Sequence, residues 1–380
     1  MFLPLRPKWF TLLLATLPLA GEPVALRVSP GTPPQQPAAA AETTPAEPAP
    51  EPAPEPAADP PAPALEKLSD LDREDTVRLQ VFLDEASFGP GVIDGRAGVF
   101  TQLAVDSWNE NQGHPDGGLS MVLSAAREQV AEPYGVTFVP KVVTDWVDPT
   151  LPADSKRAAQ ATRKRMSYRS IAEFMSERYH TDIDFLIELN GRDKINSLAP
   201  RDPLIVPNVR AFRVEDLTGA RYESGQPMSD RHLVVDTRIN QLRIFKAAPQ
   251  ALVVSEDGTP AARPNRALLA SFPITPGLSK FIKFGTFEMR NCLELPFWRY
   301  DKQLLETGKR SDDALVIPPG PNCPVGILWA GLSRPGIGLH GTNSPETIGR
   351  ARSAGCIRLA NWDAIRLPAL VRPGATVEIR

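Results

Sequence analysis

The sequence has few of the residues that metal sites and disulfide frameworks require. Its 380 residues include only three cysteines and four histidines, and none shows the paired spacing of a tetrahedral zinc site. The 42 basic residues nearly balance the 45 acidic ones, so a basic face for nucleic acid is not expected. The apolar runs of the sequence are too short to predict a polytopic membrane protein. We therefore expect no metal, no cofactor and no nucleic-acid partner.

Proline is in excess, with 41 in the chain against a usual share of about 5%. Thirteen of these prolines lie between residues 30 and 64, among Ala, Glu and Thr. Such a segment cannot bury enough apolar surface to offset its chain entropy, and its prolines favour an extended polyproline form. We interpret residues 26–65 as a disordered Pro/Ala/Glu-rich linker that holds the following domains away from a membrane.

Residues 1–25 have the pattern of an export signal. Arg6 and Lys8 precede an apolar stretch over residues 9–20, which is shorter than the ~20 residues of a membrane span. No cysteine precedes Cys292, so a lipid-modified N-terminal cysteine is not expected. We predict a protein exported to the periplasm or cell envelope with no other membrane-directed segment; retention of the signal as an uncleaved anchor is the alternative.

Residues 66–115 predict a small helical module. Apolar residues recur with helical spacing over residues 77–83, glycine-rich turns follow, and a second helix resumes near residue 103, with Thr101 as its expected cap. This order of helix, glycine-rich turn and helix resembles the peptidoglycan-binding module of wall hydrolases. A helical hairpin without a ligand is the alternative. Residues 116–165 are interpreted as a connecting segment.

Residues 166–210 predict a second small module of mixed α and β structure. Two apolar helical stripes, over residues 171–175 and 185–189, precede a short apolar run at residues 203–207 that is typical of a closing strand. The pattern resembles a LysM-type unit, a βααβ fold that binds N-acetylglucosamine chains. Its first strand would have to come from residues 166–169 or earlier.

Strand patterns dominate residues 228–380. Short runs rich in Val, Ile, Leu and Phe are bounded by Gly, Pro, Asn or Asp, which predicts a mainly-β domain of sandwich or open-barrel type. A helical pattern lies mainly at residues 361–371, with Asn361 as its expected N-cap. The chain is thus predicted to be multidomain. The predicted strands are residues 233–237, 241–245, 267–274, 284–290, 326–332 and 376–379.

A candidate nucleophile and base lie close together in this last region. His340 lies in a Gly-Leu-His-Gly-Thr run, and Cys356 follows 16 residues later. A thiol with a pKa near 8.5 needs a base to become a thiolate at neutral pH, and no other histidine lies in this stretch. The amides around Gly355 and Cys356 could form an oxyanion hole. A buried structural cysteine is the alternative, and His180 is expected to be a packing or surface residue.

The residues around this pair resemble the signature of the L,D-transpeptidases, the YkuD-type domain. His-Gly-Thr, a gap and Ser-Ala-Gly-Cys-Ile-Arg-Leu match the family pattern, usually written HG-T/S, a gap, then SHGC-I/V-R-L/M. The resemblance implies that Cys356 attacks a peptidoglycan tetrapeptide stem, releases the terminal D-alanine and passes the acyl group to an amine. His340 would be the base, and the Gly341 carbonyl would orient its ring. Further matches lie at residues 234–236, 241–245, 271–277, 284–287, 318–322, 326–329 and 374–377.

The same resemblance assigns roles around the nucleophile. Gly355 belongs to the oxyanion hole, Arg358 binds a substrate carboxylate or fixes a loop, Ser353 makes loop hydrogen bonds, and Thr342 lies among the substrate-binding residues. One position departs from the family, because Ala354 stands where its second histidine is usual. Whatever that imidazole adds to substrate contact or oxyanion support is therefore absent.

Two questions stay open at the level of sequence. Cys292 and Cys323 could form a disulfide in an oxidising compartment, worth roughly 3–4 kcal/mol on the loop-entropy model, or remain free thiols. The expected partners are stem peptides and glycan strands of peptidoglycan. An L,D-carboxypeptidase that uses water as acceptor, and a non-catalytic wall-binding protein, are the alternatives to a transpeptidase.

Overall fold

The structure, a computed structural model, describes residues 67–246, 253–254, 260–261, 267–277, 281–301, 303, 311–350 and 355–380. The predicted export signal, the proline-rich linker, Ser353 and Ala354 lie outside the described residues. Residues 62–380 form one unit, in which the regions that the sequence divides into modules pack together. Among the described residues, none of the helices combines the length and the apolar character needed to cross a bilayer.

Three helices form the first part of this unit: α1 (Arg73–Glu85), α2 (Val99–Asn111) and α3 (Leu119–Gln129). Asp72 caps α1, because its side chain accepts a hydrogen bond from the Asp75 amide at 2.8 Å. The predicted cap of α2 is wrong: the N-cap is Gly98, and Thr101 is buried inside the first turn.

Helix α3 lies in the segment that was expected only to connect two modules. Leu119, Val122 and Ala126 follow one another at helical spacing and are buried in a cluster with residues of α1 and α2. The helical hairpin is therefore a three-helix arrangement, because two helices alone would leave an apolar face of α1 uncovered.

A strand–helix–helix–strand arrangement follows. Strand β1 (Tyr134–Phe138) pairs antiparallel with β2 (Pro203–Pro207), and between them lie α6 (Ile171–Arg178) and α7 (Ile183–Asn190). The first strand thus comes well before the helices, and the chain between β1 and α6 inserts a segment over residues 139–170. That insertion and the stretch after α7 contain α4 (Val143–Trp146), α5 (Arg157–Ala161) and α8 (Arg192–Asn196).

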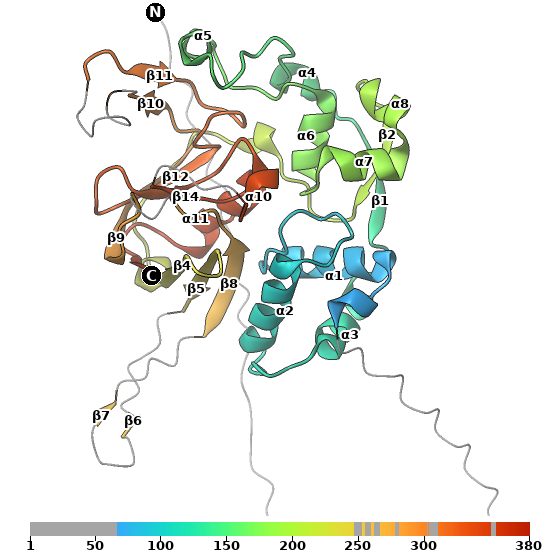
Figure 1. The fold of residues 1–380 in the computed structure, drawn as a ribbon, viewed down its shortest axis with the longest axis vertical. Helices are drawn as coiled ribbons and strands as arrows, with labels where there is room; N and C mark the ends of the chain where they lie inside the picture. Colours follow the sequence, from blue (N-terminus) through green and yellow to red (C-terminus); the bar gives the residue numbers. More distant parts are fainter. Residues whose placement is uncertain are drawn as a thin grey trace, which may run out of the picture. The chain divides into compact units, whose positions relative to one another are not determined.

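The rest of the unit is built on a nine-stranded sheet, so the mainly-β architecture is confirmed (Figure 1). All six predicted strands are present. Most neighbours are antiparallel, whereas β13–β14 and β15–β4 are parallel. The main path runs through β14 (Ile357–Arg358), β13 (Gly338–His340), β12 (Leu328–Leu332), β9 (Gly285–Glu294), β15 (Thr376–Ile379), β4 (His232–Asp236), β5 (Gln241–Phe245) and β8 (Leu268–Pro273).

Short elements complete the fold. The predicted C-terminal helix is two short helices, α10 (Asn361–Ala364) and α11 (Leu367–Leu370), and its expected cap is wrong because Ala360 is the N-cap of α10. Strand β3 pairs with β9, and β10 pairs with β11. The other short elements are η1 (Leu68–Asp70), η2 (Val214–Asp216), β3 (Arg221–Tyr222), η3 (Met228–Asp230), β6 (Val253–Val254), β7 (Pro260–Ala261), β10 (Trp298–Tyr300), β11 (Leu315–Ile317) and η4 (Pro345–Thr347).

The helices pack directly on the sheet, and Figure 1 shows α2 beside β8. Gly89, just after α1, donates its amide to the Ser271 carbonyl at 2.8 Å. Deeper in this contact, Asp84 of α1 accepts hydrogen bonds from Arg366 at 2.6 Å and pairs with His180 at 2.9 Å. His180 also stacks on Trp362, with the ring centroids 5.5 Å apart. The expectation that His180 is a packing residue is confirmed.

The predicted disulfide is not formed. In the part of the chain that the structure describes, Cys292 and Cys323 are free buried thiols. Cys292 lies on β9 in the main core, whereas Cys323 belongs to a separate apolar cluster that includes Met166. The two thiols pack into different clusters, and this separation keeps them from pairing. The sequence positions of the cysteines do not reveal that separation. Burial raises the pKa of each thiol to about 12.

Candidate active site

Two short parallel strands bring the predicted base beside the segment that carries the predicted nucleophile. Within the β13–β14 pair, His340 lies opposite Arg358 and Leu339 lies opposite Ile357. Leu339 and Ile357 are fully buried in the core, so His340 and Arg358 share the other face. Cys356 comes directly before β14, and its thiol interacts with the Gly338 backbone, two residues before His340. The charge of Arg358 acts on both His340 and Cys356, so all three groups belong to one site.

The imidazole of His340 is held in one orientation. Its Nδ1 lies 2.6 Å from the Gly341 carbonyl oxygen, and the ring stacks on Trp329 with centroids 5.8 Å apart. A carbonyl can only accept, so Nδ1 carries the hydrogen and Nε2 presents its lone pair. Burial lowers the pKa of His340 to about 4, against the opposing effect of the Gly341 hydrogen bond. His340 is therefore a neutral base at pH 7.

Cys356 is protonated in the resting site. Burial raises the pKa of its thiol, while a hydrogen bond from the Gly338 backbone and the charge of Arg358 act in the opposite direction. The sulfur also lies 3.4 Å from the Gly336 carbonyl oxygen. The site thus holds a neutral thiol beside a neutral imidazole, and a thiolate forms only when a proton moves to Nε2.

Arg358 supplies the positive charge of the site. Burial lowers the pKa of its guanidinium, and its charge lowers the pKa of both His340 and Cys356. Its backbone is fixed by two hydrogen bonds with Thr275, at 2.9 and 3.0 Å. Its Nε is buried and makes no hydrogen bond to any residue that the structure describes. The backbone hydrogen bonds therefore position the guanidinium. Its Nε–H is still available to donate a hydrogen bond.

Two glycines allow two backbone segments to approach each other closely beside the nucleophile. Gly355 adopts φ +115°, a conformation that other residues rarely adopt. A Cβ at Gly277 would lie 2.3 Å from the Gly355 Cα, so only glycine at position 277 allows this approach. Gly277 ends a motif that matches the family, but no role was predicted for it. Thr342 is buried, and its hydroxyl accepts a hydrogen bond from the Ser344 amide at 3.3 Å, which places it in the turn after His340.

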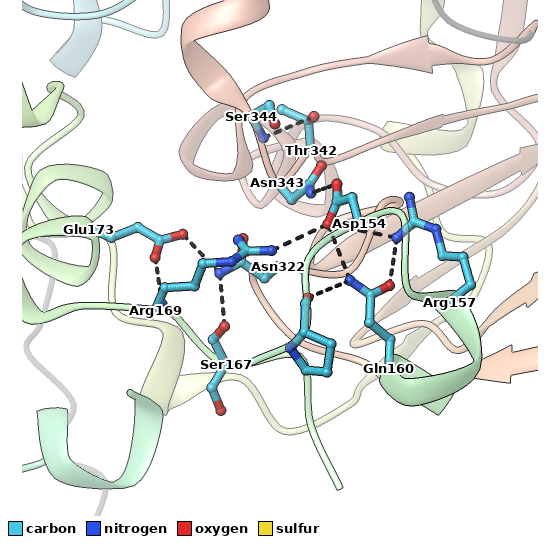
Figure 2. Close-up of polar contacts among 11 residues, drawn as sticks. Asp154, Arg157, Gln160, Ser167, Arg169, Glu173, Asn322, Thr342, Asn343 and Ser344 are labelled. Atoms are coloured by element: carbon cyan, nitrogen blue, oxygen red, sulfur yellow. Dashed lines mark hydrogen bonds and ion pairs between the residues drawn. The ribbon is translucent and has the colours of Figure 1, made fainter. Parts of the chain in front are cut away.

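The inserted segment contributes Asp154, a residue that sequence reasoning missed. Asp154 accepts hydrogen bonds from Asn343 at 2.8 Å and from Gln160 at 3.2 Å, and pairs with Arg169 at 3.3 Å (Figure 2). Its charge also opposes, in part, the lowering of the Arg358 pKa by burial. Asn343 follows the His-Gly-Thr run directly, so the insertion supports the turn that follows the base. No short-range pattern connects residues 189 positions apart.

In the described part of the chain, no group of three or more His, Cys, Asp or Glu side chains could hold a metal ion.

Comparisons with known proteins agree with this architecture. A model of the L,D-transpeptidase catalytic domain, YkuD, matches residues 232–379. A protein of Bacillus licheniformis named "Putative L,D-transpeptidase YkuD" is 46% identical over 61 residues, which are 16% of this chain and 37% of that protein. YkuD of Bacillus subtilis is 48% identical over 59 residues, 16% of this chain and 36% of that protein. The chain thus spans little more than a third of the length of these two relatives.

A longer match covers more of the domain. A protein of Fuscovulum blasticum, assigned as an L,D-transpeptidase in the ATP synthase subunits region, is 30% identical over 172 residues, 45% of this chain and 79% of that protein. The solved L,D-transpeptidase from Mycobacterium smegmatis matches 40% of this chain and 58% of its own at 15% identity; its TM-score of 0.28 is too low to add to the argument. From the YkuD match and the extent of the Fuscovulum blasticum match, the chain belongs to the L,D-transpeptidase family.

Proposed function

We propose that the protein is an exported peptidoglycan L,D-transpeptidase, an acyltransferase with Cys356 as its nucleophile. The observation that carries this proposal is the orientation of His340. The Gly341 carbonyl holds Nδ1 at 2.6 Å, so Nε2 is the nitrogen that presents its lone pair. Arg358 lies opposite His340 and two residues after Cys356, and its charge acts on both groups. A neutral base with one available lone pair beside a thiol is what acyl transfer through a thioester needs.

In the first half of the reaction, Cys356 attacks the amide between the third, diamino-acid residue and the terminal D-alanine of a stem peptide. Its proton moves from sulfur to Nε2 of His340 as the carbon–sulfur bond forms. The amides of Gly355 and Cys356 stabilise the oxyanion. The carbon–nitrogen bond then breaks, His340 returns the proton to the leaving amine of D-alanine, and a thioester remains on Cys356.

In the second half, an amine of a neighbouring stem attacks the thioester. His340 accepts a proton from this amine, the carbon–sulfur bond breaks, and the proton passes to the departing sulfur. An amide crosslink and the resting thiol result, so no cofactor is needed to balance the reaction. Arg358 binds a substrate carboxylate or fixes the loop beside the nucleophile, as its buried charge and fixed backbone support. Ser353 is proposed to make loop hydrogen bonds.

The regions before the sheet are proposed to bind the glycan strands of peptidoglycan. The three-helix part resembles a peptidoglycan-binding module in sequence, and the strand–helix–helix–strand part resembles a LysM-type unit. Tethering an enzyme to an insoluble polymer raises the local substrate concentration. With the predicted export signal, wall binding supports a proposed location in the periplasm or cell envelope.

Intact-mass measurement after incubation with tetrapeptide-bearing muropeptides tests the function. The wild-type protein should gain the mass of an acyl group, Cys356→Ala should gain none, and Cys292→Ala, which removes a buried thiol, should behave as wild type. Crosslinked dimers among the products indicate a transpeptidase, and shortened stems alone indicate an L,D-carboxypeptidase. An unmodified wild-type protein with unchanged muropeptides would favour a non-catalytic wall-binding protein.

A further inference from the structure

The glycine whose carbonyl orients His340 lies against a side chain outside the catalytic signature. A Cβ at Gly341 would lie 2.1 Å from Oδ1 of Asn361, and a Cβ at Gly326 would lie 2.2 Å from the same atom. Asn361 is fully buried, so its amide fills the space that these two glycines leave. The position of Asn361 therefore limits where the Gly341 backbone, and with it the hydrogen-bond acceptor of His340, can lie.

The amide of Asn361 is itself fixed from both ends. Its Oδ1 accepts a hydrogen bond from the Ile327 amide at 3.2 Å. Its Nδ2 donates to Oε1 of Glu177 at 2.8 Å and to the Pro321 carbonyl at 3.4 Å. A donor at one end and acceptors at the other distinguish the oxygen from the nitrogen, so only one orientation of the amide satisfies all partners.

Glu177 comes from the helical region, on α6, and is 184 residues from Asn361 in sequence. It is 5% exposed, and its second oxygen accepts a hydrogen bond from the Tyr168 hydroxyl. Both carboxyl oxygens thus have partners inside the protein. A buried carboxyl is costly unless it is hydrogen-bonded in this way, so its position is well defined by its two partners.

We propose that Glu177 is a positioning residue for catalysis: through Asn361 it fixes the Gly341 carbonyl and thereby the imidazole of His340. This inference rests on the proposed pairing of Cys356 and His340. It gives the helical region a second role beside wall binding, because a side chain of α6 sets the geometry of a base on the sheet.

The test measures the alkylation rate of Cys356 by iodoacetamide between pH 5 and 9, read by mass spectrometry of the Cys356 peptide. It needs no peptidoglycan substrate. The variants are Glu177→Leu, which removes both hydrogen bonds, Glu177→Gln, which keeps an oxygen toward Asn361, and Asn361→Ala. Phe185→Leu is the matched control, since it weakens a separate apolar cluster of the helical region. His340→Ala gives the rate without the base.

We expect Glu177→Leu and Asn361→Ala each to lower the alkylation rate at pH 7 by about 10-fold, toward the rate of His340→Ala, because a misplaced base loses its alignment with the thiol. Glu177→Gln should stay within about 2-fold of wild type, and so should Phe185→Leu once its folded fraction is accounted for. The double variant Glu177→Leu/Asn361→Ala should be no slower than either single variant, since both act through one path.

Several results would overturn the inference. They are a wild-type rate in folded Glu177→Leu, an equal loss in Phe185→Leu, or no recovery in Glu177→Gln. If Glu177→Leu does not fold, Tyr168→Phe replaces it; the loss of one bond to Glu177 should slow alkylation by about 2–3-fold, and an unchanged rate would count against the inference. A wild-type rate in His340→Ala would instead remove the proposed base, and with it the function on which this inference rests.

Discussion

The interior of the sheet and the junction between the helices and the sheet are stabilised differently. The sheet interior is apolar, with fully buried residues such as Leu233, Leu242 and Ile244. The junction also contains charged groups, among them the buried Asp84 and the half-buried Arg366. Apolar side chains tolerate small shifts, whereas buried hydrogen bonds and ion pairs require one geometry. The junction therefore fixes position as well as contributing stability.

Two carboxyl groups in the junction respond to burial in opposite ways. Burial raises the pKa of Asp84, but the charges of Arg366 and His180 and their hydrogen bonds outweigh it and hold that pKa well below its usual range. Burial raises the pKa of Asp363 to about 8, because Arg366, at 3.7 Å, opposes it only in part. The junction thus contains an ionised Asp84, paired with Arg366, beside an Asp363 carboxyl group that is mostly neutral at pH 7.

The largest effect should come from breaking that ion pair. Asp84→Ala removes the carboxylate that pairs with both Arg366 and His180 and leaves Arg366 only the more distant Asp363. It should lower the free energy of unfolding by about 3–5 kcal/mol, measured by urea denaturation. Leu242→Ala in the sheet interior should cost a similar 2–5 kcal/mol through a cavity. Adding Arg366→Met should recover stability in the Asp84→Ala background only. A cost below about 1 kcal/mol for Asp84→Ala would contradict the comparison.

Gly341→Ala tests the point where the junction meets the active site. The new methyl group would displace the Asn361 amide, so we expect a roughly 100-fold loss of acyl transfer and a loss of about 1–3 kcal/mol of stability. Gly118→Ala is the matched control, because a Cβ there meets nothing within 4 Å and φ is −82°. Equal activity in the two variants would show that the Asn361 side chain can move aside without changing the position of His340.

Glu177→Gln should change how stability depends on pH. Burial raises the pKa of Glu177 to about 8 from its usual 4.5, so the folded state binds an extra proton between these values. The free energy of unfolding of the wild-type protein should therefore fall as the pH rises from 5 to 8. The glutamine variant should be less steep by about 1–3 kcal/mol over this window in urea titrations. Parallel curves would contradict the assignment.

The pH dependence of acylation should separate the site from an exposed histidine. His340 must be neutral to accept the thiol proton, and its pKa is about 4. Acylation of Cys356 by a tetrapeptide donor should therefore stay nearly constant from pH 7 down to pH 5 and fall only near pH 4. A midpoint near 6.5, the ordinary pKa of histidine, would mean that burial does not govern this base.

The smallest effect belongs to an ion pair on the surface of the helical region. Glu188 pairs with Arg96 at 2.8 Å and also with Arg73, but it is 37% exposed. Glu188→Ala should cost less than about 1 kcal/mol in urea denaturation, because solvent screens exposed pairs. A loss as large as that of Asp84→Ala would erase the distinction between buried and exposed charges.

The features that the sequence predicted correctly have short-range signals. Short runs rich in Val, Ile, Leu and Phe, bounded by turn residues, predicted the strands, and all six of these are present. The roles of the cysteine and its neighbours stay predictions until activity is measured. Helix α3 also had a readable apolar stripe, although it was assigned to a connecting segment.

The junction had no such signal. Asp84 lies 96 residues from His180 and 282 residues from Arg366, and nothing in the local sequence connects these three positions. The predicted cap role of Asn361 shows the same limit. Its side chain suits a helix N-terminus, but long-range partners on α6 and before β12 hold the amide instead.

The burial of Cys292 and Cys323 has a practical consequence. At the pH of most enzyme assays, both sulfurs stay protonated inside apolar clusters, so Cys356 is the thiol placed to meet an electrophile from solution. The stoichiometry of a thiol reagent on the native protein then reports the fraction of competent molecules in a preparation. Turnover numbers can be normalised to that fraction before variants are compared.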